Sequence, residues 1–165
     1  MGQYTNKGLY NAYKKNNKER EEKDYYSTPT EEVYNILING ILKINELFDP
    51  KVITNIIELK YLDYLGVLPI IDRCSICGNK NNIVTLSSDK GGYLCKTCHT
   101  NEPLISDESI KLIRLYYYVD ISKIDKLNVS IKNKEEINNF LNLYYERYTG
   151  IYLRSKNFLN NIIEF

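Results

Sequence analysis

The sequence is short of several residue types, and each shortage excludes a class of protein. Its 165 residues include one histidine, His99, and no tryptophan. Acid–base catalysis by histidine therefore has almost nothing to work with. No stretch reaches the roughly 18 consecutive apolar residues that can span a bilayer. The N-terminus, MGQYTNKGLYNAYKK, lacks the apolar core of a secretory signal, so we expect a cytoplasmic protein that does not contact a membrane.

Net charge is also nearly absent, because 22 lysines and arginines are balanced by 21 acidic residues. This balance argues against a protein whose main activity is to wrap nucleic acid electrostatically. Hydrophobic residues make up 43% of the chain and charged residues 26%, which is ordinary for a soluble globular protein. A chain of this length buries roughly two thirds of its unfolded surface, so it needs neither disulfides nor a metal merely to form a core.

Two amphipathic helices are predicted after a polar N-terminal segment, residues 1–29. That segment contains the mixed-charge run 14–24, which suits either a solvated helix or a loose tail. Thr30 is expected to cap the first helix, and Gly40 within it indicates close contact with another helix. Asp49, followed by proline, is expected to cap the second helix. The predicted apolar faces are Val33, Ile36, Leu37, Ile41, Ile44 and Leu47 on the first helix, and Val52, Ile53, Ile56, Ile57, Leu59, Leu62 and Leu65 on the second.

Residues 73–100 interrupt this helical pattern with turns and a predicted hairpin, in which strand 83–86 pairs with residues 93–94. Helical periodicity then resumes. The predicted elements are a helix capped by Ser106, a shorter element over 122–127, a helix that opens with Asn133 and Glu136 as a capping box and ends or kinks at Gly150, and a last helix over 151–165. The expected fold is mainly α: a helical domain, residues 30–165, with an inserted four-cysteine zinc module at 73–100 that contains a β-hairpin.

The four cysteines form the strongest motif, Cys-x2-Cys-x17-Cys-x2-Cys. Two intervening residues let both thiolates of a pair face one ion from a single tight turn. A spacer of 17 residues suffices for a hairpin that brings the second pair to the same ion. Gly78 fits the first turn, which often needs a positive φ. The spacing predicts one structural Zn²⁺, held at about 2.3 Å by the sulfurs of Cys74, Cys77, Cys95 and Cys98.

Other interpretations of these cysteines are weaker. Disulfides need an oxidising compartment, and nothing directs the chain to one. A thiol redox site would use one cysteine pair near a βαβ pattern. Four thiolates could also hold an iron–sulfur cluster, which the spacing alone does not exclude. Catalytic zinc needs an open coordination position, which four thiolates close, and His99 lacks the His-x-Glu context of the zinc deaminases. His99 is expected beside the site or facing solvent, with ligation as the less favoured alternative.

Basic residues surround the predicted site, namely Arg73, Lys80, Lys90 and Lys96. One Zn²⁺ leaves a net negative charge on four thiolates. We therefore expect these side chains chiefly to offset that charge, and contact with phosphate is the alternative.

Three segments resemble the C-terminal part of the RecO family, the bacterial DNA repair and recombination mediators. IIELKYLDYLGVLPIIDRCSICG, residues 56–78, is similar to the family's F-E-L-x-L-L-x-x-L-G-Y-x-P helix before a Cys-x-x-Cys-Gly turn. LSSDKGGYLCKTC, residues 86–98, is similar to its Ser-Pro-x-x-Gly-Gly-x-Leu-Cys-x-x-Cys hairpin, and YLRSKNFL, residues 152–159, to its Leu-x-Ser-x-x-Phe-Leu segment. The resemblance covers residues 30–165.

The resemblance implies a mostly helical domain that bears the zinc module. It also implies action with RecR in loading RecA onto single-stranded DNA coated by single-strand-binding protein, contact with the acidic tail of that protein, and association with the nucleoid during repair. Family members begin with an OB-fold barrel, whereas about 26 residues without strand alternation precede the helices here. The chain is therefore expected to be either a fragment or a homologue without the barrel, and to bind single-stranded DNA weakly.

The candidates for contact with DNA or a partner are basic residues. The basic candidates are Lys111, Arg114, Arg147, Arg154 and Lys156. Tyrosines 116–118 lie beside the first pair, and a tyrosine run of this kind is more often the edge of a core than a platform for bases. No nucleophile–base pair or phosphate-binding loop is visible, so an enzyme is not expected. The alternative function is an unrelated zinc-ribbon module that binds nucleic acid in transcription or RNA processing.

Overall fold

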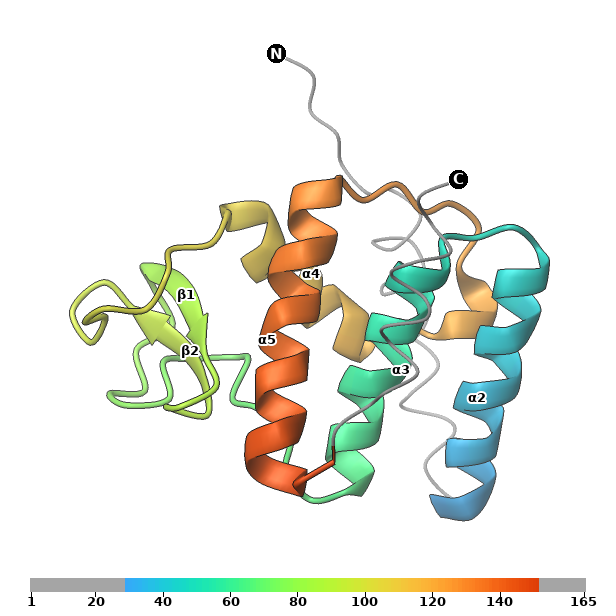
Figure 1. Ribbon diagram of the computed structural model, residues 1–165, viewed down its shortest axis with the longest axis horizontal. Coiled ribbons are helices and arrows are strands. Elements are labelled where there is room, and N and C mark those ends of the chain that lie inside the picture. Colours follow the sequence, from blue (N-terminus) through green and yellow to red (C-terminus); the bar gives the residue numbers. More distant parts are fainter. Residues whose placement is uncertain (1–28, 152–165) are drawn as a thin grey trace.

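The computed structural model describes residues 29–151, which form a helical bundle with one small hairpin at its side (Figure 1). The elements in chain order are α2 (Pro29–Asn45), α3 (Pro50–Tyr64), β1 (Ile83–Ser87), β2 (Gly92–Cys95), α4 (Asp107–Tyr118), the 3-10 turn η1 (Ile121–Lys123) and α5 (Ile131–Thr149). The predicted fold class, mainly α with a β-hairpin between the second and third predicted helices, is confirmed. Within the described range, no helix has the length and apolar character needed to cross a membrane.

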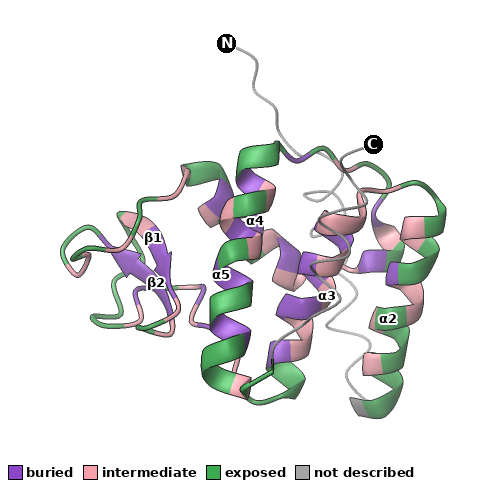
Figure 2. Ribbon diagram, viewed as in Figure 1, coloured by how far each residue is buried: buried purple, intermediate pink, exposed green. Residues whose placement is uncertain are grey.

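Helix α3 lies at the centre of the helical bundle and packs against α2, α4 and α5. Its predicted apolar face is confirmed over Val52, Ile53, Ile56, Leu59 and Leu62, all of which are fully buried. Figure 2 shows buried residues along the inner sides of α3, α4 and α5. The expectation for Gly40 is also met, because a Cβ at this position would clash with the side chain of Ile57 on α3.

Side-chain caps fix where three of the helices begin. Asp49 accepts hydrogen bonds from the backbone N–H groups of residues 51 and 52, and Ser106 caps α4 through the N–H of Ser109, both as predicted. The capping box expected at Asn133 is wrong. The cap of α5 is Ser130, whose hydroxyl accepts from the N–H of Asn133. The side chain of Asn133 points to α4 instead, so a tertiary contact takes the place of the local one.

Helix α2 departs most from its predicted pattern. It includes Pro29, so Thr30 lies within the first turn and is not its cap. Leu37 and Ile41, expected in the buried face, are 42% and 52% exposed. Leu47 lies beyond the end of the helix at a positive φ and is 93% exposed. Ile36 and Ile44 do pack against the core, as predicted. The apolar surface of this helix is wider than one packed face, so periodicity alone did not separate its inner side from its outer side.

Three smaller expectations have different outcomes. Gly150 was predicted either to end or to kink the helix, and it ends α5 in the left-handed conformation. The short element expected over 122–127 is only the three-residue η1, and Leu65, expected in the buried face of the second helix, is exposed beyond the end of α3. The last predicted helix, over 151–165, lies outside the described residues apart from Ile151.

The antiparallel hairpin β1–β2 belongs to the segment 73–100, named here the cysteine module. A backbone hydrogen bond attaches the hairpin to the chain before the module, because the N–H of Tyr93 donates to the carbonyl of Ile70 at 2.8 Å. A Cβ at Gly92 would clash with the Ile70 backbone, so the close approach needs a glycine there. The hydroxyl of Tyr93 donates to the carbonyl of Ile110, which attaches the module to α4.

Candidate metal centre

The first cysteine pair lies on a tight turn directly after the linker from α3. The N–H of Gly78 donates to the carbonyl of Cys74 at 2.9 Å, and the N–H of Cys74 donates to the carbonyl of Asn79 at 2.8 Å. Gly78 has a φ of 72°, the positive value that its place after Cys77 predicted. The turn thus points both side chains of the pair to one side.

The second pair repeats this geometry at the end of β2. The N–H groups of Cys98 and His99 both donate to the carbonyl of Cys95, at 3.0 and 2.9 Å. Since β2 pairs with β1 and β1 follows the first turn, the hairpin carries Cys95 back to Cys74, as the spacing of the cysteines required.

The four thiols form one cluster, in which all Sγ atoms lie within 4.8 Å of one another. The Sγ atoms of Cys77 and Cys95 are 3.6 Å apart. Four sulfurs at about 2.3 Å from a central Zn²⁺ would be separated by about 3.8 Å along each edge of the tetrahedron. Both the donor set and its spacing therefore fit a four-coordinate metal ion, and all four cysteines are free thiols.

Backbone hydrogen bonds prepare two of the thiols for ligation. Burial raises the pKa of Cys74, but N–H groups of Cys77, Cys95 and Ile76 outweigh it and bring the pKa to about 6. The N–H of Cys98 lowers the pKa of Cys95. Hydrogen bonding with Cys77, followed by burial and the other thiols, raises the pKa of Cys98 to about 12. Thiols this close cannot all ionise unless a cation compensates their charge.

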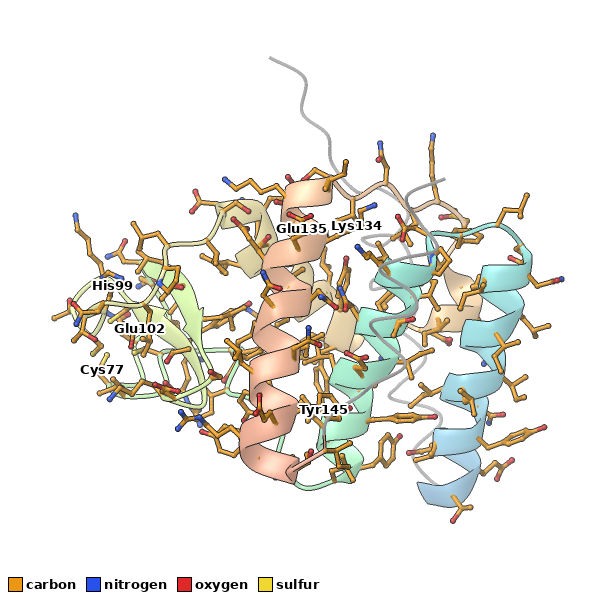
Figure 3. All side chains as sticks on the ribbon, in the orientation of Figure 1. Cys77, His99, Glu102, Lys134, Glu135 and Tyr145 are labelled. Atoms are coloured by element: carbon orange, nitrogen blue, oxygen red, sulfur yellow. The ribbon has the colours of Figure 1, made fainter. Side chains whose placement is uncertain are left out.

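His99 lies next to the cluster but outside its donor set. Its Nε2 is 2.7 Å from the carbonyl oxygen of Glu102, whose carboxylate accepts a hydrogen bond from the N–H of Thr100. Figure 3 shows Cys77, His99 and Glu102 together at the end of the molecule that the hairpin forms. This agrees with the favoured expectation for His99, a position beside the site.

The basic candidates within the described residues lie on two helices, α4 and α5. Lys111 and Arg114 are exposed on α4, where the Arg114 guanidinium lies 6.0 Å from the ring centre of Tyr118. Arg147, in the last turn of α5, forms an ion pair with Asp89 at the tip of the hairpin. Arg154 and Lys156 lie outside the described residues. Tyr116 is fully buried, in keeping with a core role for this part of the tyrosine run.

A groove that the sequence did not predict lies between the cysteine module and α5. It measures about 760 Å³. Leu86 and Phe140 are almost fully buried in its floor, whereas Leu104 and Leu143 are 66% and 57% exposed at its rim. Its lining comes from three segments that are far apart in the chain, so no local pattern could have indicated it. Its charged residues are Asp89, Lys90, Glu102 and Glu136.

Comparison with known proteins identifies the family. The family model described as the C-terminal part of recombination protein O matches residues 26–157. The DNA repair protein RecO of Bacillus pumilus (strain SAFR-032) is 32% identical over 137 residues, which cover 81% of this chain and 54% of that protein. RecO of Bacillus subtilis (strain 168) is 31% identical and that of Listeria monocytogenes serotype 4b (strain CLIP80459) 29% identical, over the same shares. This chain thus spans about half the length of the curated relatives it matches. It belongs to the RecO family.

Proposed function

We propose that this chain forms the helical and zinc-binding part of a DNA recombination mediator that acts in DNA repair and catalyses no reaction of its own. The observation that carries the proposal is the four-thiol cluster, inserted into a helical domain that matches the RecO family over residues 26–157. The matched range also supports treating residues 30–165 as one domain.

The metal proposed for the cluster is a single structural Zn²⁺. Cys74, Cys77, Cys95 and Cys98 would hold it with four thiolates, which is a closed shell without a position for a substrate. Its chemical contribution would be to bind the two turns of the cysteine module to each other. A purely structural metal agrees with a protein that works by holding partners together.

The proposed partners are RecR and the acidic tail of single-strand-binding protein, in the loading of RecA onto single-stranded DNA. The groove beside α5 is the described surface that best suits a short peptide. Its floor is apolar, and its carboxylates Glu102 and Glu136 already accept hydrogen bonds from within the chain. Lys90 and Arg147, which pairs with Asp89, offset part of the charge of the three carboxylates, so apolar contact with the floor would contribute most of the binding.

DNA binding by this chain is proposed to be weak. Arg147 already pairs with Asp89, which leaves Lys111 and Arg114 as the best-placed candidates within the described part of the chain. Two or three phosphate contacts give a shallow dependence of affinity on salt, with a slope of about −0.7 per contact on single strands.

A binding experiment with the full chain tests this function. We expect RecR and a peptide of the acidic tail to be retained by the immobilised protein. Leu143→Glu, at the rim of the groove, should weaken retention of the peptide. Ile131→Glu, on the same helix and also exposed but outside the groove, should not. Retention of neither partner, together with tight sequence-specific binding of nucleic acid by the cysteine module, would support the zinc-ribbon alternative instead.

A further inference from the structure

Helix α2 carries apolar side chains on both of its sides. Its inner side packs on α3 around Gly40. Its outer side leaves Tyr34, Leu37, Ile41 and Leu42 exposed by 61%, 42%, 52% and 51%. Figure 2 shows these exposed stretches along α2, which lies at the edge of the bundle. A polar stripe of Asn35, Asn39 and Lys43 runs along α2, and the apolar surface beside it is wider than one packed face needs. The outer side, named here the outer face of α2, is therefore expected to be covered.

The size of the outer face favours a cover from the same chain. The exposed surface of these four side chains amounts to roughly 400 Å², whereas each partner in a standard protein interface contributes roughly 800 Å². A patch of this size alone is too small for a stable complex between two copies. A segment linked to α2 needs less area, because the link gives it a high effective concentration.

The sequence immediately before α2 has the composition that such a cover needs. Residues 1–18 contain four lysines, at positions 7, 14, 15 and 18, and no acidic residue. In a helix, Leu9, Tyr10 and Tyr13 would share one side, since they are three and four residues apart. Helix α2 has two glutamates in its first turn, Glu31 and Glu32. The apolar side chains of the two segments are complementary, and so are their charges at the first turn of α2.

We propose that residues 1–18 dock on the outer face of α2 as an amphipathic helix that runs antiparallel to it. Both helices rise about 1.5 Å per residue, so placing Lys18 beside Glu31 fixes the height of every other residue along α2. Tyr13 then lies within one residue of the height of Leu37, and Leu9 within one residue of the height of Ile41. Residues 19–28 make the connection. A helix of 18 residues is about 27 Å long, so in this register it covers α2 from Glu31 to its C-terminal end.

A double-mutant cycle in the full chain tests the proposal. Leu9→Ser and Ile41→Ser should each lower the melting temperature by roughly 3–6 °C. The double variant should lose clearly less than the sum of the two, because each substitution removes the same contact. Ile131→Ser is the matched control, since this side chain is 71% exposed at the start of α5, and it should cause little change.

A carbodiimide cross-link gives an independent readout of the register. It should join Lys18 to Glu31 within monomers, and it should not join Lys7 to Glu31, because Lys7 would lie near the other end of α2. Equal linkage of both lysines would overturn the proposal. Additive effects of Leu9→Ser and Ile41→Ser on the melting temperature would also overturn it. If the effect of Ile41→Ser depends on protein concentration, the outer face is covered by a second copy. If that effect is coupled to Phe158→Ser instead, the outer face is covered by residues 152–165.

Discussion

The helical bundle and the cysteine module are held together by different means. The bundle buries a continuous apolar core, to which α3, α4 and α5 contribute fully buried side chains. The buried cluster of the cysteine module itself consists of Cys74, Leu94 and Cys95. Such a cluster cannot offset the conformational entropy lost when residues 73–100 become ordered. The bundle therefore depends on its apolar packing, whereas the module depends on what its four thiols bind.

The two regions are nevertheless joined at defined points. Tyr93 donates to the Ile110 carbonyl on α4, and Arg147 of α5 pairs with Asp89 at the tip of the hairpin. Leu86 and Tyr93 of the hairpin also pack into the apolar core that the helices share. Most of that core comes from the helices themselves, so loss of the module should leave the bundle folded but less stable at the faces of α4 and α5 that the module covers.

The largest effect is expected on removing a proposed metal ligand. Cys98→Ser should abolish tight metal binding and unfold residues 73–100, because zinc binding to small thiolate sites contributes about 10–16 kcal/mol at neutral pH. Hydrogen exchange followed by mass spectrometry should show protection lost across the module and kept in α3. Thr97→Ala, an exposed position between the ligands of the second pair, is the control. Loss of protection in α3 to the same extent would show that the two regions do not fold separately.

A core substitution in the bundle should destabilise the bundle and leave metal binding by the cysteine module unchanged. Leu59→Ala removes a fully buried side chain of α3 and should lower the free energy of unfolding of the bundle by about 2–5 kcal/mol. The metal content at room temperature should not change, since Leu59 belongs to the core cluster that is separate from the one around the thiols. Chemical denaturation and metal analysis of the same sample measure both quantities. A fall in metal content in the still-folded variant would contradict the comparison.

A smaller effect is expected at the contact between α4 and α5. Burial raises the pKa of Glu136, but hydrogen bonds from Ser109 and Ser106 and the charge of Lys132 outweigh it, so the pKa is lower than in the unfolded chain. The stability that Glu136 contributes is therefore complete above its unfolded pKa and is lost as the pH falls through the lower folded pKa. Glu136→Gln should cost about 1–2 kcal/mol at pH 7, with the difference from the natural protein vanishing in acid.

The control for this pH dependence is Glu135→Gln, an exposed neighbour on the same helix. It should leave the unfolding free energy unchanged at both pH values. An equal cost of Glu136→Gln at every pH would show that packing, and not the charge of the carboxylate, explains its contribution.

The sequence predicted the features that local chemistry decides. The cysteine spacing indicated the cluster, and Asp49, Ser106 and Gly150 marked helix ends correctly, because caps and tight turns involve residues a few positions apart. The features it missed depend on distant residues. Arg147 pairs with Asp89, and Asn133 bonds to Glu108 on another helix. On α2, Ile36 and Ile44 were predicted correctly to pack on the core, whereas Leu37 and Ile41 were not, because the apolar residues of this helix allow more than one buried face.

Metal analysis of the purified full chain tests the central claim most directly. We expect native mass spectrometry together with elemental analysis to find one Zn²⁺ per folded chain, lost on substitution of any one of Cys74, Cys77, Cys95 and Cys98. Iron in place of zinc, or a folded cysteine module without any metal, would contradict the account.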